Sequence, residues 1–173
     1  ESANGVVAAS AGNHAMALAH AARTLGVRCE VFMPSASPLT KIEGAEALGA
    51  KVILGGDSVD ACLVSAKERA SSGNLAFVHP FDDPHIVAGQ GTLGLELVED
   101  VPDLAKIVVP VGGGGLAAGV AIAVKALNPG VEVVGVQIDT CAPYPESLKA
   151  GRPIEVSSQL TIADSIAVKT PGG

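Results

Sequence analysis

Short, mostly apolar runs alternate with longer segments along this chain, and this alternation constrains the fold more than any other feature. The clearest runs are Val6–Ala9, Cys29–Met33, Lys51–Leu54 and Ile107–Val111. Runs of four or five such residues, closed by a turn containing Gly, Pro or Ser, indicate buried parallel strands. The segments between them have the length of crossover helices. The pattern therefore predicts an α/β fold, doubly wound, with three αβα layers and parallel strands.

Two further strands and six helices complete this rhythm. The strands are expected at Leu75–His79 and Val131–Ile138. Ser37 should cap the second helix, because Ser is a favoured N-cap and Pro38 suits the first helical position. The helices are expected at residues 15–25, 38–48, 58–71, 85–99, 116–127 and 145–149.

The rhythm changes near residue 80, where a loop with two prolines follows the fourth strand. We therefore expect parts of two adjoining α/β subdomains, a smaller one at residues 1–79 and a larger one at residues 80–173. The first helix of the second part contains Gly89, Gly91 and Gly94. Glycine is costly in a helix interior, so another element should pack closely against this helix.

Composition excludes several classes of partner. The net charge is −7 with 11 Lys and Arg among 173 residues, which disfavours a nucleic-acid surface. No apolar run reaches membrane-spanning length. The first residues lack a basic segment followed by an apolar one, so we expect no secretory signal. Cys29, Cys62 and Cys141 are widely spaced and form no CxxC, so neither a disulfide framework nor a zinc site is expected. We expect a cytoplasmic protein with no metal site.

A run of four glycines, Gly112–Gly115, lies between a strand and a helix. Bare backbone N–H groups and a helix N-terminus are suited to bind a phosphate. The alternative is a tight crossing, although one or two glycines would satisfy it. Gly112, Gly114 and Ala117 also match G-x-G-x-x-A, with Asp139 after the next strand, so an NAD-binding Rossmann domain is a second alternative.

A second turn, Ser10-Ala-Gly-Asn-His14, joins the first strand to the first helix. Such a turn gathers N–H donors suited to a carboxylate. The alternative is ordinary helix capping by Ser10 or Asn13, with His14 as a polar helix residue. The residues alone leave these two interpretations balanced.

The two turns together resemble the threonine dehydratase and serine racemase family, the fold type II pyridoxal-phosphate (PLP) enzymes. Further segments match in the same order. The stretches Val134–Gln137 and Tyr144–Leu148 are most similar to bacterial threonine ammonia-lyases. The matches run along essentially the whole chain: Ser10–Ala15, His79-Pro80, Ile86–Thr92, Val111–Leu116 and Thr161–Asp164.

The resemblance implies a role for each turn. The backbone amides of the tetraglycine loop, with Leu116 after it, would bind the PLP phosphate. Asn13 would hydrogen-bond the phenolic oxygen of the pyridine ring, and Gln90 would support the first turn from the helix beneath. The loop that holds the substrate carboxylate would consist of Ser10, Ala11, Gly12 and His14.

Three departures from the family pattern matter. None of the lysines lies in the Ser-Phe-Lys-x-Arg-Gly context of the Schiff-base lysine, which we expect upstream of Glu1. We therefore interpret the chain as an internal fragment that is inactive alone. Ala11 replaces the Ser that serves racemases as a second-face acid or base, which favours elimination. Gln137 replaces a metal-binding Glu of many relatives.

The resemblance thus implies a PLP-dependent threonine or serine dehydratase that yields a 2-oxo acid and ammonia. L-threonine and L-serine would be its substrates, the full-length protein would be a homo-oligomer, and a place in isoleucine biosynthesis would follow. Neither nucleic acid nor a membrane is an expected partner. The alternatives are a serine racemase-type PLP enzyme, an NAD-binding oxidoreductase domain and a non-catalytic domain.

Overall fold

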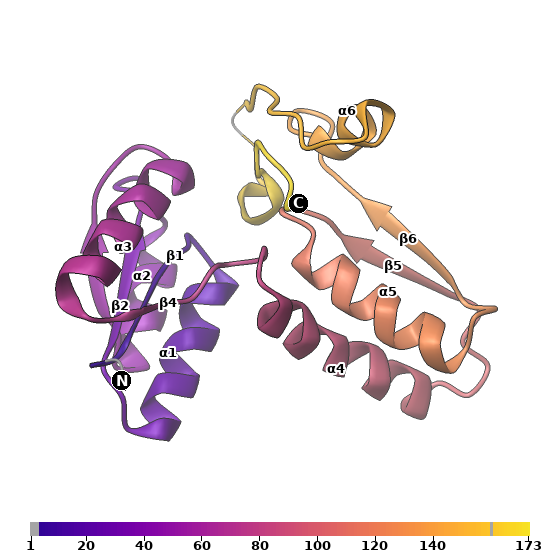
Figure 1. The fold of residues 1–173 in the computed structure, drawn as a ribbon, viewed down its shortest axis with the longest axis horizontal. Coiled ribbons are helices and arrows are strands. Elements are labelled where there is room, and N and C mark those ends of the chain that lie inside the picture. Colours follow the sequence, from indigo (N-terminus) through magenta and orange to yellow (C-terminus); the bar gives the residue numbers. More distant parts are fainter. Residues whose placement is uncertain (1–3, 160) are drawn as a thin grey trace. The chain divides into compact units, whose positions relative to one another are not determined.

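The computed structural model describes residues 4–159 and 161–173 (Figure 1). Two compact units divide the chain, with the boundary between Pro80 and Phe81. Each unit contains a parallel sheet and its own helices, which confirms the predicted α/β class.

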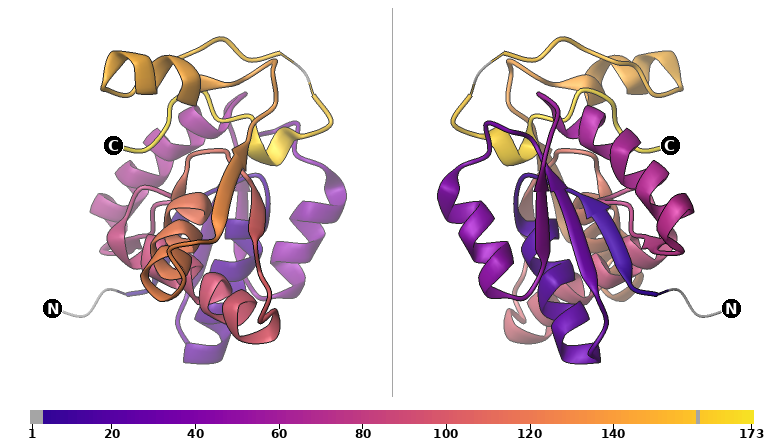
Figure 2. Two further views of the ribbon diagram at one scale, coloured as in Figure 1. Left: turned by 90° about the vertical axis from the view of Figure 1, so that its right-hand side faces the viewer. Right: turned by 90° about the vertical axis from the view of Figure 1, so that its left-hand side faces the viewer.

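Unit 1 alternates strand and helix from end to end. Its four strands form one parallel sheet in the order β3-β2-β1-β4 (Figure 2). The elements are β1 (Val6–Ala9), α1 (Asn13–Leu25), β2 (Cys29–Met33), α2 (Leu39–Ala47), β3 (Lys51–Leu54), α3 (Val59–Gly73) and β4 (Ala76–Phe77).

Both faces of this sheet are covered, which gives unit 1 the three layers expected. Cys29, Val31 and Met33 of β2 pack against alanines of α1 and α2 on one face. Val7 and Ala9 of β1 pack against α3 on the other face. Because successive strand residues point to opposite faces, a central strand covered on both sides must be apolar nearly throughout, as β1 and β2 are.

The strand order reverses at β1. From β1 the chain moves outward through β2 to β3, and then returns to place β4 on the other side of β1. In doubly wound sheets a ligand binds beyond the carboxyl ends of the strands at such a switch point. The segment at this point, after β1, is the Ser10–His14 turn.

Unit 2 has two parallel strands and three α-helices in its described part. Within it α4 and α5 lie side by side in Figure 1, and α5 packs against the β5–β6 sheet through Val120 and Val124. The elements are α4 (Pro84–Asp100), β5 (Lys106–Pro110), α5 (Gly115–Leu127), β6 (Glu132–Val136), α6 (Pro143–Ala150) and the 3-10 helix Asp164–Ile166.

Small residues allow α4 and α5 to approach closely. A Cβ on Gly91 would lie 3.3 Å from the carbonyl oxygen of Gly119, and a Cβ on Gly94 would lie 3.0 Å from that of Val120. This confirms the expected close packing for two of the three glycines. It is wrong for Gly89, which is exposed and has no heavy atom within 4 Å of its Cβ position.

Several expectations about element ends are also wrong. The strand expected at Val131–Ile138 spans only Glu132–Val136. Pro38, and not Ser37, is the N-cap of α2, and the helix has no side-chain cap. Ser37 Oγ is buried and has no partner among the described residues. The fourth strand ends at Phe77 and not at His79, because the Val78 carbonyl binds the His14 side chain instead of continuing the ladder.

The described residues contain no helix long and apolar enough to cross a membrane. They also contain no group of three or more His, Cys, Asp or Glu side chains that could hold a metal ion.

Candidate functional site

The tetraglycine loop presents an uncapped helix N-terminus within unit 2. Helix α5 begins at Gly115, and its N-cap Gly114 has a left-handed φ of 104°. No side chain caps the helix, and its first turn has no acidic residue. The first helical hydrogen bond joins Ala118 N to Gly114 O at 2.8 Å, so the N–H groups of residues 115–117 have no acceptor in the helix. Three donors and the helix dipole thus point at one place, which suits an anion.

Side chains of the same unit enclose this loop. A Cβ on Gly113 would overlap the Phe81 ring, and one on Gly115 would lie 2.6 Å from the Phe81 carbonyl oxygen. A Cβ on Gly114 would overlap the Tyr144 hydroxyl. Close packing therefore requires glycine at three successive positions, and at Gly114 a φ of 104° requires it as well.

Two polar side chains connect the loop to α6. Tyr144 Oη donates to the Gly113 carbonyl at 3.1 Å. Gln137 Oε1 accepts from the Tyr144 backbone N–H at 3.0 Å, and Gln137 Nε2 donates to the Val111 carbonyl at 3.3 Å. Burial raises the pKa of Tyr144 above its ordinary value, with the charge of Asp82 as a second cause, so its hydroxyl stays protonated and remains a donor at neutral pH. The sequence alone did not reveal this connection.

The Ser10–His14 turn presents a second uncapped helix N-terminus, within unit 1. Ser10 Oγ accepts from Gly12 N at 3.1 Å, and this hydrogen bond closes the turn before α1. Gly12 is the N-cap, no side chain caps α1, and its first turn has no acidic residue. Ordinary capping by Ser10 or Asn13, the alternative interpretation of this turn, is therefore not what the side chains do. The N-terminus of α1 remains available to an anion at the switch point of the sheet.

His14 is held neutral in this turn. Burial lowers its pKa below the ordinary value; the hydrogen bond to Val78 opposes this effect, and His79 adds to it. His14 Nε2 lies 3.3 Å from the Val78 carbonyl oxygen. A carbonyl oxygen accepts only, so Nε2 carries the hydrogen and Nδ1 of the neutral ring is an acceptor. A bound carboxylate would therefore meet backbone N–H groups here, and not an imidazolium.

The remaining site residues named from the sequence lie on these same elements. Asn13 is the first residue of α1 and is exposed, and Ala11 is half-buried in the turn. Leu116 lies in the first turn of α5 and packs beside the core of unit 2. Gln90 lies on α4, where its Cβ faces Gly119 of α5. The first two residues belong to unit 1 and the other two to unit 2.

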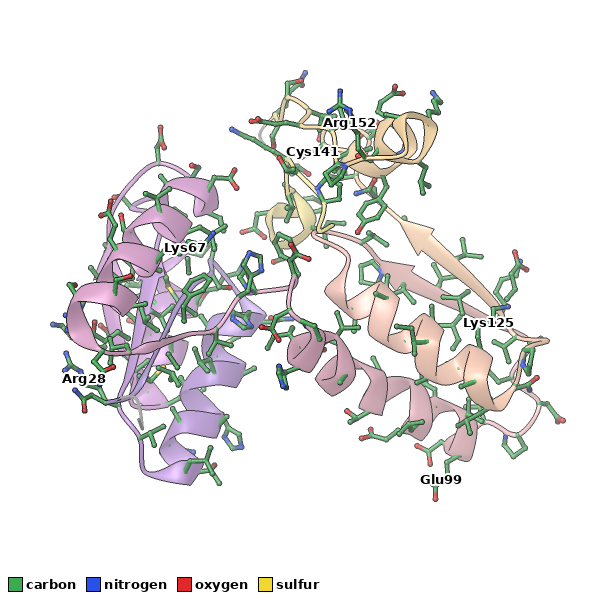
Figure 3. The ribbon with its side chains drawn as sticks, in the orientation of Figure 1. Arg28, Lys67, Glu99, Lys125, Cys141 and Arg152 are labelled. Atoms are coloured by element: carbon green, nitrogen blue, oxygen red, sulfur yellow. The ribbon has the colours of Figure 1, made fainter. Side chains whose placement is uncertain are left out.

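A buried ion pair that sequence reasoning missed stabilises the sheet of unit 1. Glu30 is fully buried on β2 and accepts from Arg69 Nε at 2.7 Å and from Arg69 Nη2 at 3.0 Å. Arg28, labelled in Figure 3, also pairs with it. These hydrogen bonds, those of Arg69 above all, hold the pKa of Glu30 below its ordinary value against the opposing effect of burial. The one signal in the sequence was an acidic residue inside an otherwise buried strand.

The three cysteines are structural. Cys29, Cys62 and Cys141 are all buried, the last at the turn before α6 (Figure 3). Burial, with Glu30 nearby, raises the pKa of Cys29 to about 11, and burial also raises that of Cys62. Thiols with raised pKa values are poor nucleophiles at neutral pH.

Two glycine-containing helix N-termini, each placed after a parallel strand of an α/β chain, are typical of proteins that bind anionic small molecules. The whole chain, residues 1–173, matches the model of the pyridoxal-phosphate dependent enzymes, and it belongs to that family. This assignment supports the PLP interpretation over the NAD-binding alternative.

Individual relatives agree with this assignment. The chain is 50% identical over 168 residues to an L-threonine ammonia-lyase of Thermotoga maritima, covering 97% of this chain and 42% of the relative. It is 45% identical to an L-threonine ammonia-lyase of Geobacter sulfurreducens, covering 98% of this chain and 42% of the relative. The chain thus spans less than half the length of these curated relatives.

Solved structures show the same fold. The processed form of threonine deaminase isoform 2 from Solanum lycopersicum superposes with a TM-score of 0.90 at 38% identity, covering 99% of this chain and 50% of that one. Maize serine racemase superposes with a TM-score of 0.91 at 34% identity, covering 98% of this chain and 51% of that one.

The tetraglycine loop fits the phosphate of PLP. Its backbone carries no Cβ over four residues, its helix start has no protein cap, and no acidic side chain lies in the first helical turn to repel an anion. These are the properties expected of a loop that receives a phosphate from outside the chain.

Proposed function

We propose that the full-length protein is a PLP-dependent ammonia-lyase that converts L-threonine or L-serine to 2-oxobutanoate or pyruvate and ammonia. The uncapped tetraglycine start of α5 is the observation that carries this proposal. The identities of 50% and 45% to L-threonine ammonia-lyases support it.

Residues of unit 2 would hold the cofactor. The backbone N–H groups of Gly112–Gly115 and Leu116 would donate to the phosphate, helped by the positive end of the α5 dipole. PLP, when bound, serves as an electron sink that acidifies the α-hydrogen of an amino acid. The four glycines contribute placement, since they fix the phosphate end of the cofactor at one position.

Residues of unit 1 would bind the substrate carboxylate. Ser10, Ala11, Gly12 and His14 surround the N-terminus of α1, where the N–H groups are uncapped. Because the His14 ring is neutral, the carboxylate would be bound by these N–H groups, and no imidazolium would lie beside the substrate. Asn13 would donate to the phenolic oxygen of the cofactor.

Elimination is favoured over racemisation by Ala11. Racemisation needs a proton donor on each face of the substrate carbon, and a methyl group supplies none. Serine racemase is the alternative function, because two of the similar structures are serine racemases at 34% and 35% identity. The residue at position 11 distinguishes the two activities.

The setting of this activity is also a proposal. The substrates would be small amino acids, the full-length protein would act in the cytoplasm as a homo-oligomer, and the loss of ammonia from L-threonine would place it in isoleucine biosynthesis. The similarity to a biosynthetic L-threonine dehydratase of Pasteurella multocida, at 42% identity, supports the last point.

The full-length enzyme, loaded with PLP, tests the reaction type. L-threonine and L-serine are supplied in turn, 2-oxo acid is measured by coupling to lactate dehydrogenase, and D-serine is measured by chiral chromatography. We expect rapid formation of 2-oxo acid with little D-serine. D-serine formed as fast as pyruvate would replace the dehydratase with a racemase, and the absence of both products would refute the proposal.

A further inference from the structure

The carbonyl oxygen of Gly113 is held by two donors from distant parts of unit 2. Tyr144 Oη donates to it at 3.1 Å and Gly172 N at 3.0 Å. The peptide between Gly113 and Gly114 is planar and trans, so its N–H points opposite to its carbonyl. Two hydrogen bonds on the carbonyl side therefore fix the direction of the Gly114 N–H.

The peptide between Val111 and Gly112 is held in the same way. Gln137 Nε2 donates to the Val111 carbonyl at 3.3 Å, which fixes the direction of the Gly112 N–H. Gln137 also accepts the Tyr144 backbone N–H, so one continuous set of hydrogen bonds runs from Val111 through Gln137 and Tyr144 to Gly113. We call these two side chains the Gln137–Tyr144 strap.

The Gln137–Tyr144 strap restricts the backbone freedom of four successive glycines. Glycine has the greatest backbone freedom of all residues, and an anion site needs its N–H groups held in one arrangement before the ligand arrives. The Tyr144 hydroxyl occupies the space where a Cβ of Gly114 would lie. The loop and the strap are therefore complementary in shape as well as hydrogen-bonded.

We propose that Tyr144 is a positioning residue for the phosphate loop: its hydroxyl holds the Gly113–Gly114 peptide in the orientation that binds the cofactor phosphate, and Gln137 holds Tyr144. This inference rests on the proposed function, because it assigns the loop to a phosphate. Tyr144 acts through the backbone and has no role in proton transfer.

The test uses Tyr144→Phe in the full-length enzyme, since this change removes only the hydroxyl. Ser147→Ala is the matched control: Ser147 lies on the same helix, donates to the Pro143 carbonyl at 2.8 Å and accepts from Ile154 N at 2.9 Å, without touching the loop. Gln137→Met is a second variant that removes both Gln137 hydrogen bonds at nearly constant volume.

The readouts are the PLP dissociation constant after reconstitution and the ³¹P chemical shift of the bound phosphate. We expect Tyr144→Phe and Gln137→Met to weaken PLP binding by about three- to tenfold, the effect of one ordinary hydrogen bond, and to move the ³¹P resonance. Ser147→Ala should lower thermal stability and leave both readouts at their parental values.

Two results would overturn the inference alone. One is a Tyr144→Phe enzyme with the parental PLP affinity and ³¹P shift. The other is a Ser147→Ala enzyme that loses affinity as much as Tyr144→Phe does, which would make the strap a general support of α6. A parent enzyme that binds no PLP would refute the proposed function and this inference together, so the two failures are distinguishable.

Discussion

Replacing Gly114 by Ala should weaken PLP binding by the full-length enzyme for two separate reasons, backbone strain and the loss of one hydrogen bond. Gly114 has a φ of 104°, where an L-residue is strained by about 1–2 kcal/mol. The added methyl also overlaps the Tyr144 hydroxyl, so the hydrogen bond to Gly113 is lost at a cost of about 0.5–1.5 kcal/mol.

Together these effects amount to about 1.5–3.5 kcal/mol, or roughly 10- to 300-fold in the dissociation constant of PLP. The cost falls on binding because the empty loop of the variant is free to relax, while the phosphate requires the original conformation. Titration of cofactor-free enzyme with PLP, followed by absorbance, measures it directly.

Gly151→Ala is the matched control for this change. Gly151 is also left-handed, with a φ of 64° at the end of α6, but its Cβ position has no heavy atom within 4 Å. It should cost about 1 kcal/mol of stability and leave PLP affinity unchanged. Adding Tyr144→Phe to Gly114→Ala removes the overlapping oxygen, so the second change should cost less in the double variant than in the parent. A Gly114→Ala enzyme within threefold of the parental affinity would refute the reasoning.

Four other predictions test separate features. Ala11→Ser in the full-length enzyme should raise the rate of D-serine formation, measured by chiral chromatography, because general acid–base groups supply ~10²–10⁴ in rate; an unchanged rate would remove Ala11 as the deciding residue. Glu30→Gln should lower the free energy of unfolding at pH 7, measured by urea denaturation, by about 1.5–3 kcal/mol. Its folded pKa is depressed, so this stabilisation is present above the unfolded value of about 4.3 and is lost as pH falls through the folded pKa, and the variant should match the parent at low pH. Gly119→Ala should lower the melting temperature, since its methyl would lie 2.7 Å from Gly91 N, whereas Gly89→Ala on an open surface should raise it slightly. Borohydride reduction of the isolated 173-residue chain with PLP should label no single lysine stoichiometrically, and one such lysine would contradict the expectation of an inactive fragment.

The sequence alone predicted the local structure of the chain well where local causes decide it. The bounds of β1, β2 and β3 were predicted to the residue, because each is a short apolar run between turn residues. The end of α1 was also predicted, because Gly26 adopts the left-handed C-cap conformation that glycine favours. The tetraglycine loop was also identified from the sequence, because four successive glycines leave the backbone free to bind a ligand closely.

Tertiary structure decided what depends on residues far apart in the chain. Glu30 and Arg69 are 39 residues apart, and Tyr144 and Gly113 are 31 apart, so no local pattern could pair them. Local signals even misled at Ser37, whose buried hydroxyl caps no helix, and at the end of β4, where the Val78 carbonyl binds the His14 side chain. The placement of the Ser10–His14 turn at the switch point followed from the strand order β3-β2-β1-β4. The physical reason is that side-chain hydrogen bonds and sheet order arise from packing between elements, whereas helix and strand limits arise from the backbone preferences of neighbouring residues.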